Sequence, residues 1–595
     1  MTAYKAPLAD MRFVMFDLLK LDQQYARIEG GANATRDVVD AILDEAARFS
    51  ENVLAPLNAS GDEQGCVLDK ATATVTTPKG FKEAYAKYVE GGWNGLTAPE
   101  IYGGQHLPDS IGAPLKEMLD SANLSWGNFP LLSHGATEAL RLHGEEWQRE
   151  AFLKPIVEGR WTGTMCLTEP HCGSDLGLLR TRAEPNGDGT FKLSGTKIFI
   201  TAGEHDLTEN IVHLVLARLP DAPAGVKGIS LFIVPKFKVD KSGQMGARNG
   251  VTCGAIEHKM GIKASVTCVM NFDAADGYLI GAPNKGLNAM FTMMNTARLA
   301  VGIQGLGLTE RAYQSSLAYA RDRLQGRALS GAKFPDKPAD PLIVHPDIRR
   351  MLLTQKAFAE GGRALGYYAA SLVDLVERAA DADERKRAEE LLSFIIPITK
   401  ALLTETANEC TYHAVQILGG HGYIHESGLE QFARDARITT IYEGTTGIQA
   451  LDLLGRKIMQ TQGVGLKHFL EEIGAFCQAS VGNGAVQEFV VPLITAAKQW
   501  ADITQEIAKR AAVNPEEIGV AAVDYLFYSG YIAIAYFWAR SVAAAQTSAQ
   551  SAEFKQAKLA TARFYYARIL PRTLAHAANL HASADTLMAL SAEQF

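Results

Sequence analysis

The sequence contains few cysteines, and no two of them have metal-ligand spacing. Only seven of its 595 residues are cysteine, and no CxxC pair occurs. A sparse and odd-numbered set excludes both a disulfide framework and a thiolate metal site, because each needs clustered or paired cysteines. We therefore predict a protein of a reducing, cytoplasmic compartment with no metal site.

The chain also lacks an excess of positive charge. It carries 58 Lys and Arg against 66 Asp and Glu, which gives a formal net charge of −8. Residues 457–595 hold 11 basic and 11 acidic side chains, so no basic block lies there either. Binding to nucleic acid depends on a basic surface. We therefore expect no nucleic-acid partner.

No segment predicts export or insertion into a membrane. Residues 1–10 lack a basic stretch followed by a long apolar run, so we expect no signal peptide. Residues 518–538 are long enough to span a membrane, but Asp524 would cost about 3 kcal/mol there. The preceding residues 514–517 are typical of a helix start in a soluble protein. We expect a buried helix and no membrane association.

Familiar cofactor and nucleophile motifs are missing. There is no P-loop, no HExxH and no GxSxG elbow. The glycines of GIQGLGL (302–308) follow a helical run, whereas a dinucleotide fingerprint needs a strand before the turn, so we interpret them as close helix packing. His421 and His425 stand four residues apart without a third ligand nearby, and we interpret them as part of a polar loop.

The hydrophobic pattern changes twice along the chain. Apolar residues have helical spacing in 35–160, short β-branched and aromatic runs follow from 161, and helical spacing returns at 284. We predict an α+β fold with a helical N-terminal domain, a middle antiparallel β-barrel or sandwich, a helical bundle and an additional all-α C-terminal domain. The expected segments are an N-terminal extension (1–34), then 35–160, 161–283, 284–456 and 457–595. The expected strands are 191–202, 210–219, 228–237 and 265–273.

The N-terminal extension contains a short amphipathic stretch. Its apolar residues fall within 11–19. We expect this stretch to pack onto the body of the protein or onto a partner subunit.

The first candidate functional segment is MCLTEPHCGSD, residues 165–175, where helices give way to strands. Small and hydroxyl residues around Gly173 allow backbone N–H groups and the side chains of Thr168 and Ser174 to approach an anionic or carbonyl-rich ligand. An ordinary capped loop is the alternative interpretation.

The second candidate segment consists of QILGGHG (416–422), RDA (434–436) and IYEGTTGIQ (441–449). Glu443 stands between Tyr442 and Gly444 in an otherwise apolar and small setting. Desolvation raises the pKa of a carboxyl group in such a place, which suits a general base near neutral pH. A helix N-cap glutamate is the alternative interpretation.

Taken in this order, with strands after the first segment, the motifs resemble the acyl-CoA dehydrogenase family. The shared motifs are LTEP-x-x-GSD (167–175), SGTK-x-FIT-A (194–202), QILGG, RDA and IYEGT. The resemblance covers residues 35–456, and both ends of the chain resemble a longer bacterial subgroup. It implies FAD as the cofactor and an enzyme that oxidises an acyl-CoA thioester to a trans-2-enoyl-CoA.

The resemblance assigns the catalytic base to Glu443. In the family a glutamate takes the α-proton, and the β-hydrogen leaves as hydride to flavin N5. The backbone N–H of the base and a flavin hydroxyl polarise the thioester carbonyl. Some relatives carry the base on an earlier helix, but the equivalent stretch here, residues 294–298, contains no carboxylate.

The resemblance also implies binding residues. Those expected to hold the flavin are Met165, Leu167, Thr168, Ser174, Phe199, Ile200, Thr201, Arg323, Gln416, Gly419, Gly420, Thr445 and Gln449. Those expected along the CoA and acyl channel are Ser174, Asn295, Arg298, Tyr442 and Gly444. Because residues 416–420 would approach the flavin of a neighbouring subunit, we expect a homo-oligomer, with a dimer favoured.

The resemblance leaves the substrate open. We expect a medium- to long-chain fatty acyl-CoA of β-oxidation, with electrons passed to an electron-transfer flavoprotein. A 3-methylthiopropionyl-CoA dehydrogenase is one alternative. An acyl-CoA oxidase, which lets oxygen reach the flavin, is the other.

Overall fold

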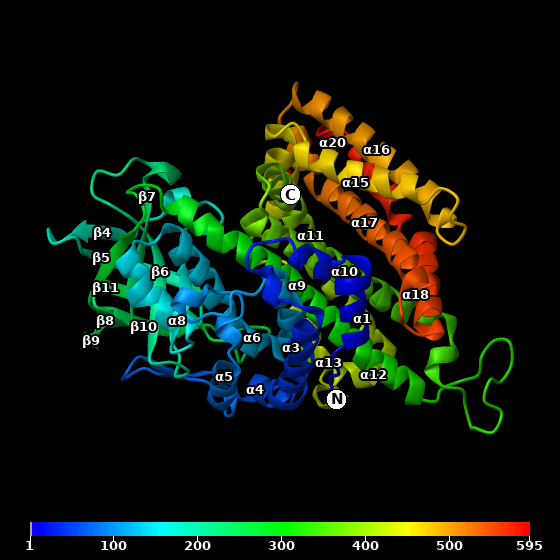
Figure 1. Ribbon diagram of the computed structural model, residues 1–595, viewed down its shortest axis with the longest axis horizontal. Coiled ribbons are helices and arrows are strands. Elements are labelled where there is room, and N and C mark those ends of the chain that lie inside the picture. The colour runs from blue at the N-terminus through cyan, green and yellow to red at the C-terminus, as the bar shows by residue number, and fades with distance from the viewer. Residues whose placement is uncertain (1–2) are drawn as a thin grey trace. The chain divides into compact units, whose positions relative to one another are not determined.

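The structure is a computed structural model that describes residues 3–595, and it divides into two compact units. The helical unit contains the described residues up to Ala47 together with Pro108–Ser121 and Val301–Phe595. The barrel unit contains Arg48–Leu107 and Ala122–Ala300. Figure 1 shows the elements of each. The sequence-based division into five segments stays a prediction.

The centre of the barrel unit is a seven-stranded sheet that closes on itself. Its strands are β3 (Trp161–Cys166), β4 (Arg182–Pro185), β5 (Phe191–Thr201), β6 (Asn210–Arg218), β7 (Ile229–Pro235), β10 (Val251–Ile256) and β11 (Thr267–Ile280). The pairs β11–β5, β5–β4, β4–β6, β6–β7 and β7–β11 form a ring. β10 lies beside β11, and β3 lies beside β6. This closed sheet is the predicted barrel.

The four predicted strands became β5, β6, β7 and β11, and they pair antiparallel with one another as expected. β3 and β4, which were not predicted, pair in parallel with β6. β6 shares a core with the long helix α6 (Gly112–His143), through Val212, Leu214 and Leu216 of the strand and Leu132 and Leu140 of the helix. Burial on both faces explains why β6 is an almost continuous apolar run.

The long helix α6, four shorter helices and two hairpins accompany the barrel. They are α4 (Asn58–Gln64), β1 (Val67–Asp69), β2 (Thr74–Thr76), α5 (Phe81–Glu90), α6 (Gly112–His143), α7 (Glu146–Gln148), α8 (Lys154–Val157), β8 (Phe237–Val239) and β9 (Met245–Arg248). The long helices α6 and α9 (Gly286–Asp322) contribute residues to both units. Asn123 interrupts α6 with non-helical backbone angles, and its side chain accepts a hydrogen bond from the Trp126 N–H at 3.0 Å.

The helical unit is built around three long helices. Its helices, apart from α6 and α9, are α1 (Leu8–Arg12), α2 (Leu21–Tyr25), α3 (Arg36–Phe49), α10 (Pro346–Arg378), α11 (Ala382–Leu418), α12 (Gly420–Tyr423), α13 (Leu429–Thr439), α14 (Thr446–Leu451), α15 (Val464–Ala479), α16 (Gln487–Ala511), α17 (Glu516–Thr547), α18 (Ala552–Phe564), α19 (Arg572–Leu580) and α20 (Asp585–Met588). α10, α11 and α17 contact one another, and α15 and α16 pack outside α17 (Figure 1).

The glycines of GIQGLGL bring α9 close to α11. A Cβ added at Gly305 would lie 2.5 Å from the Leu403 carbonyl oxygen, and one added at Gly302 would lie 3.4 Å from the Lys400 Cα. The contact at Gly305 leaves no room for a side chain there, and the one at Gly302 is tight. The interpretation of this motif as close helix packing is confirmed.

Among the described residues, α17 is the one helix long and apolar enough to cross a membrane. However, 67% of its apolar window is buried inside the protein. Asp524 accepts hydrogen bonds from His576 at 2.7 Å and Asn579 at 3.1 Å, so its charge has polar partners from a neighbouring helix. This packing agrees with the predicted buried helix.

The N-terminal extension packs on its own chain. Phe13, Val14, Met15 and Phe16 are buried, in a π-helical stretch that continues α1. The Ser548 hydroxyl donates to the Asp17 carboxylate at 2.7 Å, so the extension contacts the C-terminal helices.

A buried group of charges, here named the Arg363 cluster, joins these segments. It consists of Asp10, Glu117, Glu310, Glu360, Arg363 and Lys558. The Arg363 guanidinium has no exposed surface, and it pairs with Glu117 at 2.5 Å, Glu310 at 2.7 Å and Asp10. Lys558 pairs with Asp10 and with Glu360 at 2.7 Å. The N-terminal extension and the C-terminal helices are thereby held to α10 by one set of ion pairs.

Candidate functional site

The segment after β3 makes a tight turn. The Glu169 N–H donates to the Cys172 carbonyl at 2.9 Å, and the Cys172 N–H donates to the Glu169 carbonyl at 3.1 Å. Leu167 and Thr168 are half-buried and Ser174 is exposed, so part of this predicted flavin segment is open to a ligand. The Asp175 side chain also accepts from the Gly177 N–H at 2.9 Å, so the segment is a capped loop as well as a candidate site.

A buried ion pair anchors this turn to the barrel. Lys197 on β5 donates to the Glu169 carboxylate at 2.8 Å and to the Leu167 carbonyl at 3.0 Å. Burial works to raise the pKa of the Glu169 carboxyl, but Lys197 and Thr181 hold that pKa below its usual value. Lys197 therefore fixes the main chain of Leu167, one of the predicted flavin contacts.

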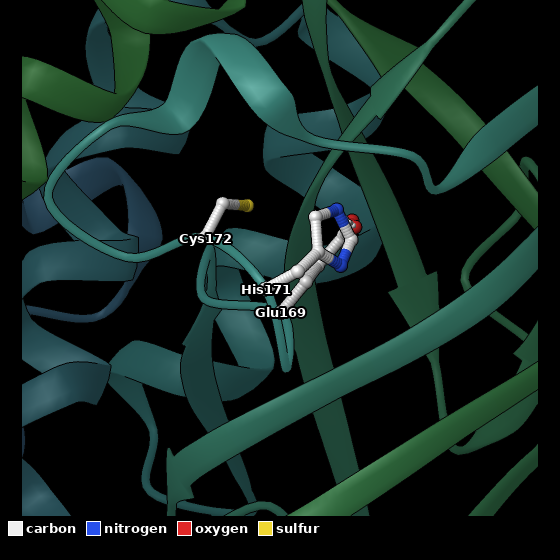
Figure 2. Close-up of side chains that lie close together, drawn as sticks. All are labelled: Glu169, His171 and Cys172. Atoms are coloured by element: carbon white, nitrogen blue, oxygen red, sulfur yellow. Dashed lines mark ion pairs between the residues drawn. The ribbon is translucent and has the colours of Figure 1, made fainter.

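Glu169, His171 and Cys172 form the one group of three possible metal ligands within residues 3–595 (Figure 2). Their ligand atoms lie within 4.8 Å of one another. The Glu169 carboxylate already accepts four hydrogen bonds: one from Lys197, two from Thr181 and one from the Arg180 N–H. His171 Nε2 lies 2.9 Å from the Leu178 carbonyl oxygen. Glu169 and His171 thus have partners within the protein.

His421 and His425 have separate partners. His425 Nδ1 lies 2.6 Å from the Glu430 carboxylate, and His421 Nδ1 lies 3.4 Å from the Tyr319 hydroxyl. Both histidines are exposed. Their contacts agree with the polar loop that the sequence suggested.

The predicted flavin segment on β5 contains a bulge with an exposed aromatic ring. The pairing of β5 with β11 slips between Cys268 and Met270, and Phe199 takes a left-handed φ of 58°. The Phe199 side chain is 59% exposed, whereas Ile200 is buried. A bulge re-aims a side chain, and an open aromatic face suits stacking on a planar ring system. These residues fit an isoalloxazine ring, with Ile200 able to contribute its main chain.

The predicted channel residues on α9 differ in exposure. Asn295 is exposed and Arg298 is buried. Both belong to the barrel unit.

The predicted phosphate and neighbour-subunit contacts lie in the helical unit. Arg323 follows the end of α9 and is exposed. Gln416, Gly419 and Gly420, at the end of α11, are exposed as well, and a Cβ on either glycine would meet nothing within 4 Å. These positions are open to a partner molecule.

Glu443 lies in a turn between α13 and α14 with a strained backbone. Its φ is 55°, a left-handed value that costs free energy for a residue with a side chain, and the φ of Gly444 is 95°. Strained backbone of this kind persists where surrounding contacts hold it, and such residues cluster at active sites. The N-cap of α14 is Thr445, whose hydroxyl accepts from the Ile448 N–H at 3.2 Å. The N-cap interpretation of Glu443 is therefore wrong.

Three side chains fix the main chain and neighbours of Glu443, and we name this arrangement the base clamp. Lys400 on α11 donates to the Gly444 carbonyl at 2.7 Å. The Gln449 amide donates to the Glu443 carbonyl at 3.1 Å. The Tyr442 hydroxyl donates to Gln304 on α9 at 2.5 Å. Glu443 itself is half-buried.

The base clamp bears on several sequence predictions. Gln449, predicted to hold the adenosine half of the flavin, is buried with its amide nitrogen bonded to the base segment. Tyr442 is tied to Gln304 through its hydroxyl. Lys197, Lys400 and Gln304 were not predicted to have a role. Lys197 and Gln304 lie inside motifs quoted for other reasons, whereas no local pattern marks Lys400.

Family models match nearly the whole chain. Those for the N-terminal, middle and C-terminal domains of acyl-CoA dehydrogenases match residues 37–160, 164–275 and 284–459. A model described as acetyl-CoA dehydrogenase C-terminal like matches residues 469–591. The last match covers most of the additional C-terminal helices.

Relatives that align with almost the whole of this chain support the same family. The chain is 43% identical to the 3-methylmercaptopropionyl-CoA dehydrogenase of Ruegeria pomeroyi, over 99% of this chain and 100% of that protein. It is 34% identical to the broad-specificity linear acyl-CoA dehydrogenase FadE5 of Mycobacterium tuberculosis, over 96% of both. An acyl-CoA dehydrogenase from Bacillus anthracis, solved in complex with FAD, shares the fold with a TM-score of 0.74 at 22% identity, over 92% of this chain and 89% of that one. The chain therefore belongs to the acyl-CoA dehydrogenase family, as an FAD-dependent oxidoreductase with an additional C-terminal helical domain.

Proposed function

We propose that this enzyme removes the α-proton of an acyl-CoA thioester with Glu443. The observation that carries the proposal is the half-buried Glu443 in a strained turn whose carbonyl groups are held by Lys400 and Gln449. The Glu443 backbone N–H donates to the thioester carbonyl, so that charge developing on that oxygen is stabilised. When bound, FAD accepts the hydride that leaves the β-carbon. The product is a trans-2-enoyl-CoA.

We propose a set of flavin contacts. Phe199 supplies an aromatic face, and Leu167, Thr168 and Thr201 supply polar main-chain or hydroxyl groups. The exposed Arg323 is a bidentate donor for the flavin diphosphate. Met165, Ser174, Ile200, Thr445 and Gln449 complete the proposed set, and Gln416, Gly419 and Gly420 serve the flavin of a second copy in a homodimer.

For the substrate we propose 3-methylthiopropionyl-CoA, with a linear fatty acyl-CoA as the second candidate. The relative at 43% identity acts on the first class, and the relative at 34% identity acts on the second. Asn295, Arg298 and Ser174 are the proposed contacts with the CoA and acyl chain, together with Tyr442 and Gly444. Anaerobic bleaching of the flavin by thioesters from short to long chain, including 3-methylthiopropionyl-CoA, ranks the candidates.

The base assignment has its own test. Glu443→Gln should retain the flavin, yet no acyl-CoA should bleach it, because the amide cannot take the α-proton. Rapid bleaching of this variant would show that another group is the base.

We propose an electron-transfer flavoprotein as the electron acceptor and the cytoplasm as the compartment. An acyl-CoA oxidase would reoxidise rapidly in air. Stopped-flow measurement of the reduced enzyme with oxygen, compared with an electron-transfer flavoprotein, separates the two.

A further inference from the structure

The base clamp assigns a role to a lysine that is remote in sequence from Glu443. Lys400 is fully buried in the middle of α11, and its ammonium lies 2.7 Å from the Gly444 carbonyl oxygen. Burying an ammonium group is costly unless polar groups surround it. Lys400 is nevertheless buried, and its ammonium binds the peptide group that follows Glu443. This points to a function for that peptide group.

The packing of α9 on α11 sets the position of this lysine. The added Cβ at Gly302, 3.4 Å from the Lys400 Cα, marks where the two helices touch. Gln304 lies two residues after Gly302 on α9, and its side chain accepts a hydrogen bond from the Tyr442 hydroxyl. The GIQGLGL motif thus brings together the two helices that supply Gln304 to Tyr442 and Lys400 to Gly444.

The turn at Glu443 needs such contacts. Two successive residues have left-handed φ values of 55° and 95°, and the first of them carries a side chain. A conformation of this kind holds only if the surroundings over-determine it. Lys400 and Gln449 bind the two successive carbonyl groups of the turn, and charge-assisted bonds such as that of Lys400 are the stronger kind.

We infer that Lys400 is a positioning residue for proton abstraction. It holds the Glu443–Gly444 main chain in the conformation that directs the Glu443 carboxylate and backbone N–H toward the thioester. Lys400 itself transfers no proton. The inference rests on the proposal that Glu443 is the base.

The test separates positioning from folding. In Lys400→Met, which keeps the length of the side chain but removes its charge and donors, we expect flavin reduction to slow about 10–100-fold. The Kd for acyl-CoA, the flavin content and the Tm should change little. Lys400→Arg should recover part of the rate. Thr411→Val, which removes another buried hydrogen bond of α11, is the matched control and should reduce at the wild-type rate.

A second measurement follows the turn directly. Amide hydrogen exchange of a peptide covering residues 440–449 should quicken in Lys400→Met and stay unchanged in Thr411→Val. Should Lys400→Met not fold, Gln449→Leu removes the other carbonyl contact and should slow reduction and quicken exchange in the same way.

The outcomes are distinct. Wild-type reduction in Lys400→Met, or a slow rate accompanied by equal loss of flavin and Tm, overturns the positioning role. If Glu443→Gln is inactive in that case, the base assignment survives. Normal reduction in Glu443→Gln overturns the proposed function itself.

Discussion

The base clamp and the Arg363 cluster are both buried polar groups of the helical unit, but they use different partners. In the base clamp, Lys400 and Gln449 bind main-chain carbonyl groups beside one half-buried carboxylate. In the Arg363 cluster, a guanidinium without exposed surface faces three carboxylates. We propose that the first arrangement directs the Glu443 carboxylate. The second ties remote segments of the chain together.

This difference separates two kinds of effect. Breaking a buried ion pair leaves an uncompensated charge inside the protein, so the folded state suffers. Lys400 and Gln449 bind main-chain carbonyl groups, which carry no net charge, so for the loss of these bonds we expect mainly the reaction to suffer. Variants should therefore sort into those that change the rate and those that change the free energy of unfolding.

The largest effect should come from Glu443→Gln. Loss of the base should slow flavin reduction by about 10³–10⁴-fold, and the free energy of unfolding should stay near that of the wild type because the side chain is half-exposed. Stopped-flow reduction and denaturant unfolding measure the two quantities. Glu389→Gln removes an exposed carboxylate of α11 and is the control that should change neither. Equal losses of rate and stability would remove the distinction between the two clusters.

Arg363→Met should show the opposite pattern, a loss of stability without a loss of rate. Without the guanidinium, Asp10, Glu117 and Glu310 stay buried and the free energy of unfolding should fall by about 3–5 kcal/mol. The rate of flavin reduction per folded molecule should stay unchanged. Arg350→Met, on the same helix, breaks an exposed pair with Asp347 and should cost less than about 1 kcal/mol. Similar costs for the two arginines would contradict a special role of the cluster.

Gly444→Ala should affect the base clamp at its tightest point. The φ of 95° is unfavourable for alanine, and the new Cβ would lie 2.5 Å from the Gln449 amide nitrogen. Displacement of the adjacent Glu443 should slow reduction by about 10²-fold. Gly474→Ala, in a helix with open space around the Cβ, should leave the rate intact. An unimpaired Gly444→Ala enzyme would mean that the turn tolerates movement.

The last effect is on the pH dependence of stability, and it concerns a buried carboxylate outside both clusters. Burial and the nearby Asp109 raise the pKa of Asp374 to about 8. From about pH 4 to pH 8 the unfolded chain has lost this proton while the native state keeps it, so stability falls as the pH rises through this window.

Asp374→Asn should remove that slope and raise stability at pH 8. It keeps an acceptor for the Ser110 N–H. Urea unfolding across the window measures the slope, and a slope equal to that of the wild type would refute the shifted pKa.

The sequence predicted what short contiguous motifs encode. Glu443 could be proposed as the base because IYEGT is unbroken, and the barrel strands were predicted because their apolar runs end in turn residues. GIQGLGL was correctly interpreted as helix packing because no strand precedes it. In each case the physical signal lies within about ten residues.

What the sequence did not predict depends on distant residues. Lys400 lies in an ordinary helical stretch, and its role requires knowing that α14 returns beside α11. β3 and β4 were missed because β3 is short and fully buried and β4 is short and polar. The members of the Arg363 cluster come from five separate stretches of chain. No local pattern marks charged residues that meet only after folding.

The Asp10–Lys558 contact also sets an order for folding during synthesis. Its partners are 548 residues apart. At about 5–20 residues per second, a ribosome needs roughly 30–110 s to make the second partner after the first. During that interval Phe13 lacks Phe554, the ring it contacts at 5.2 Å in the finished protein. The segment around Asp10 therefore waits for the helices around Lys558 before it is fully buried, and until then a newly made chain exposes an apolar surface of the kind that chaperones bind.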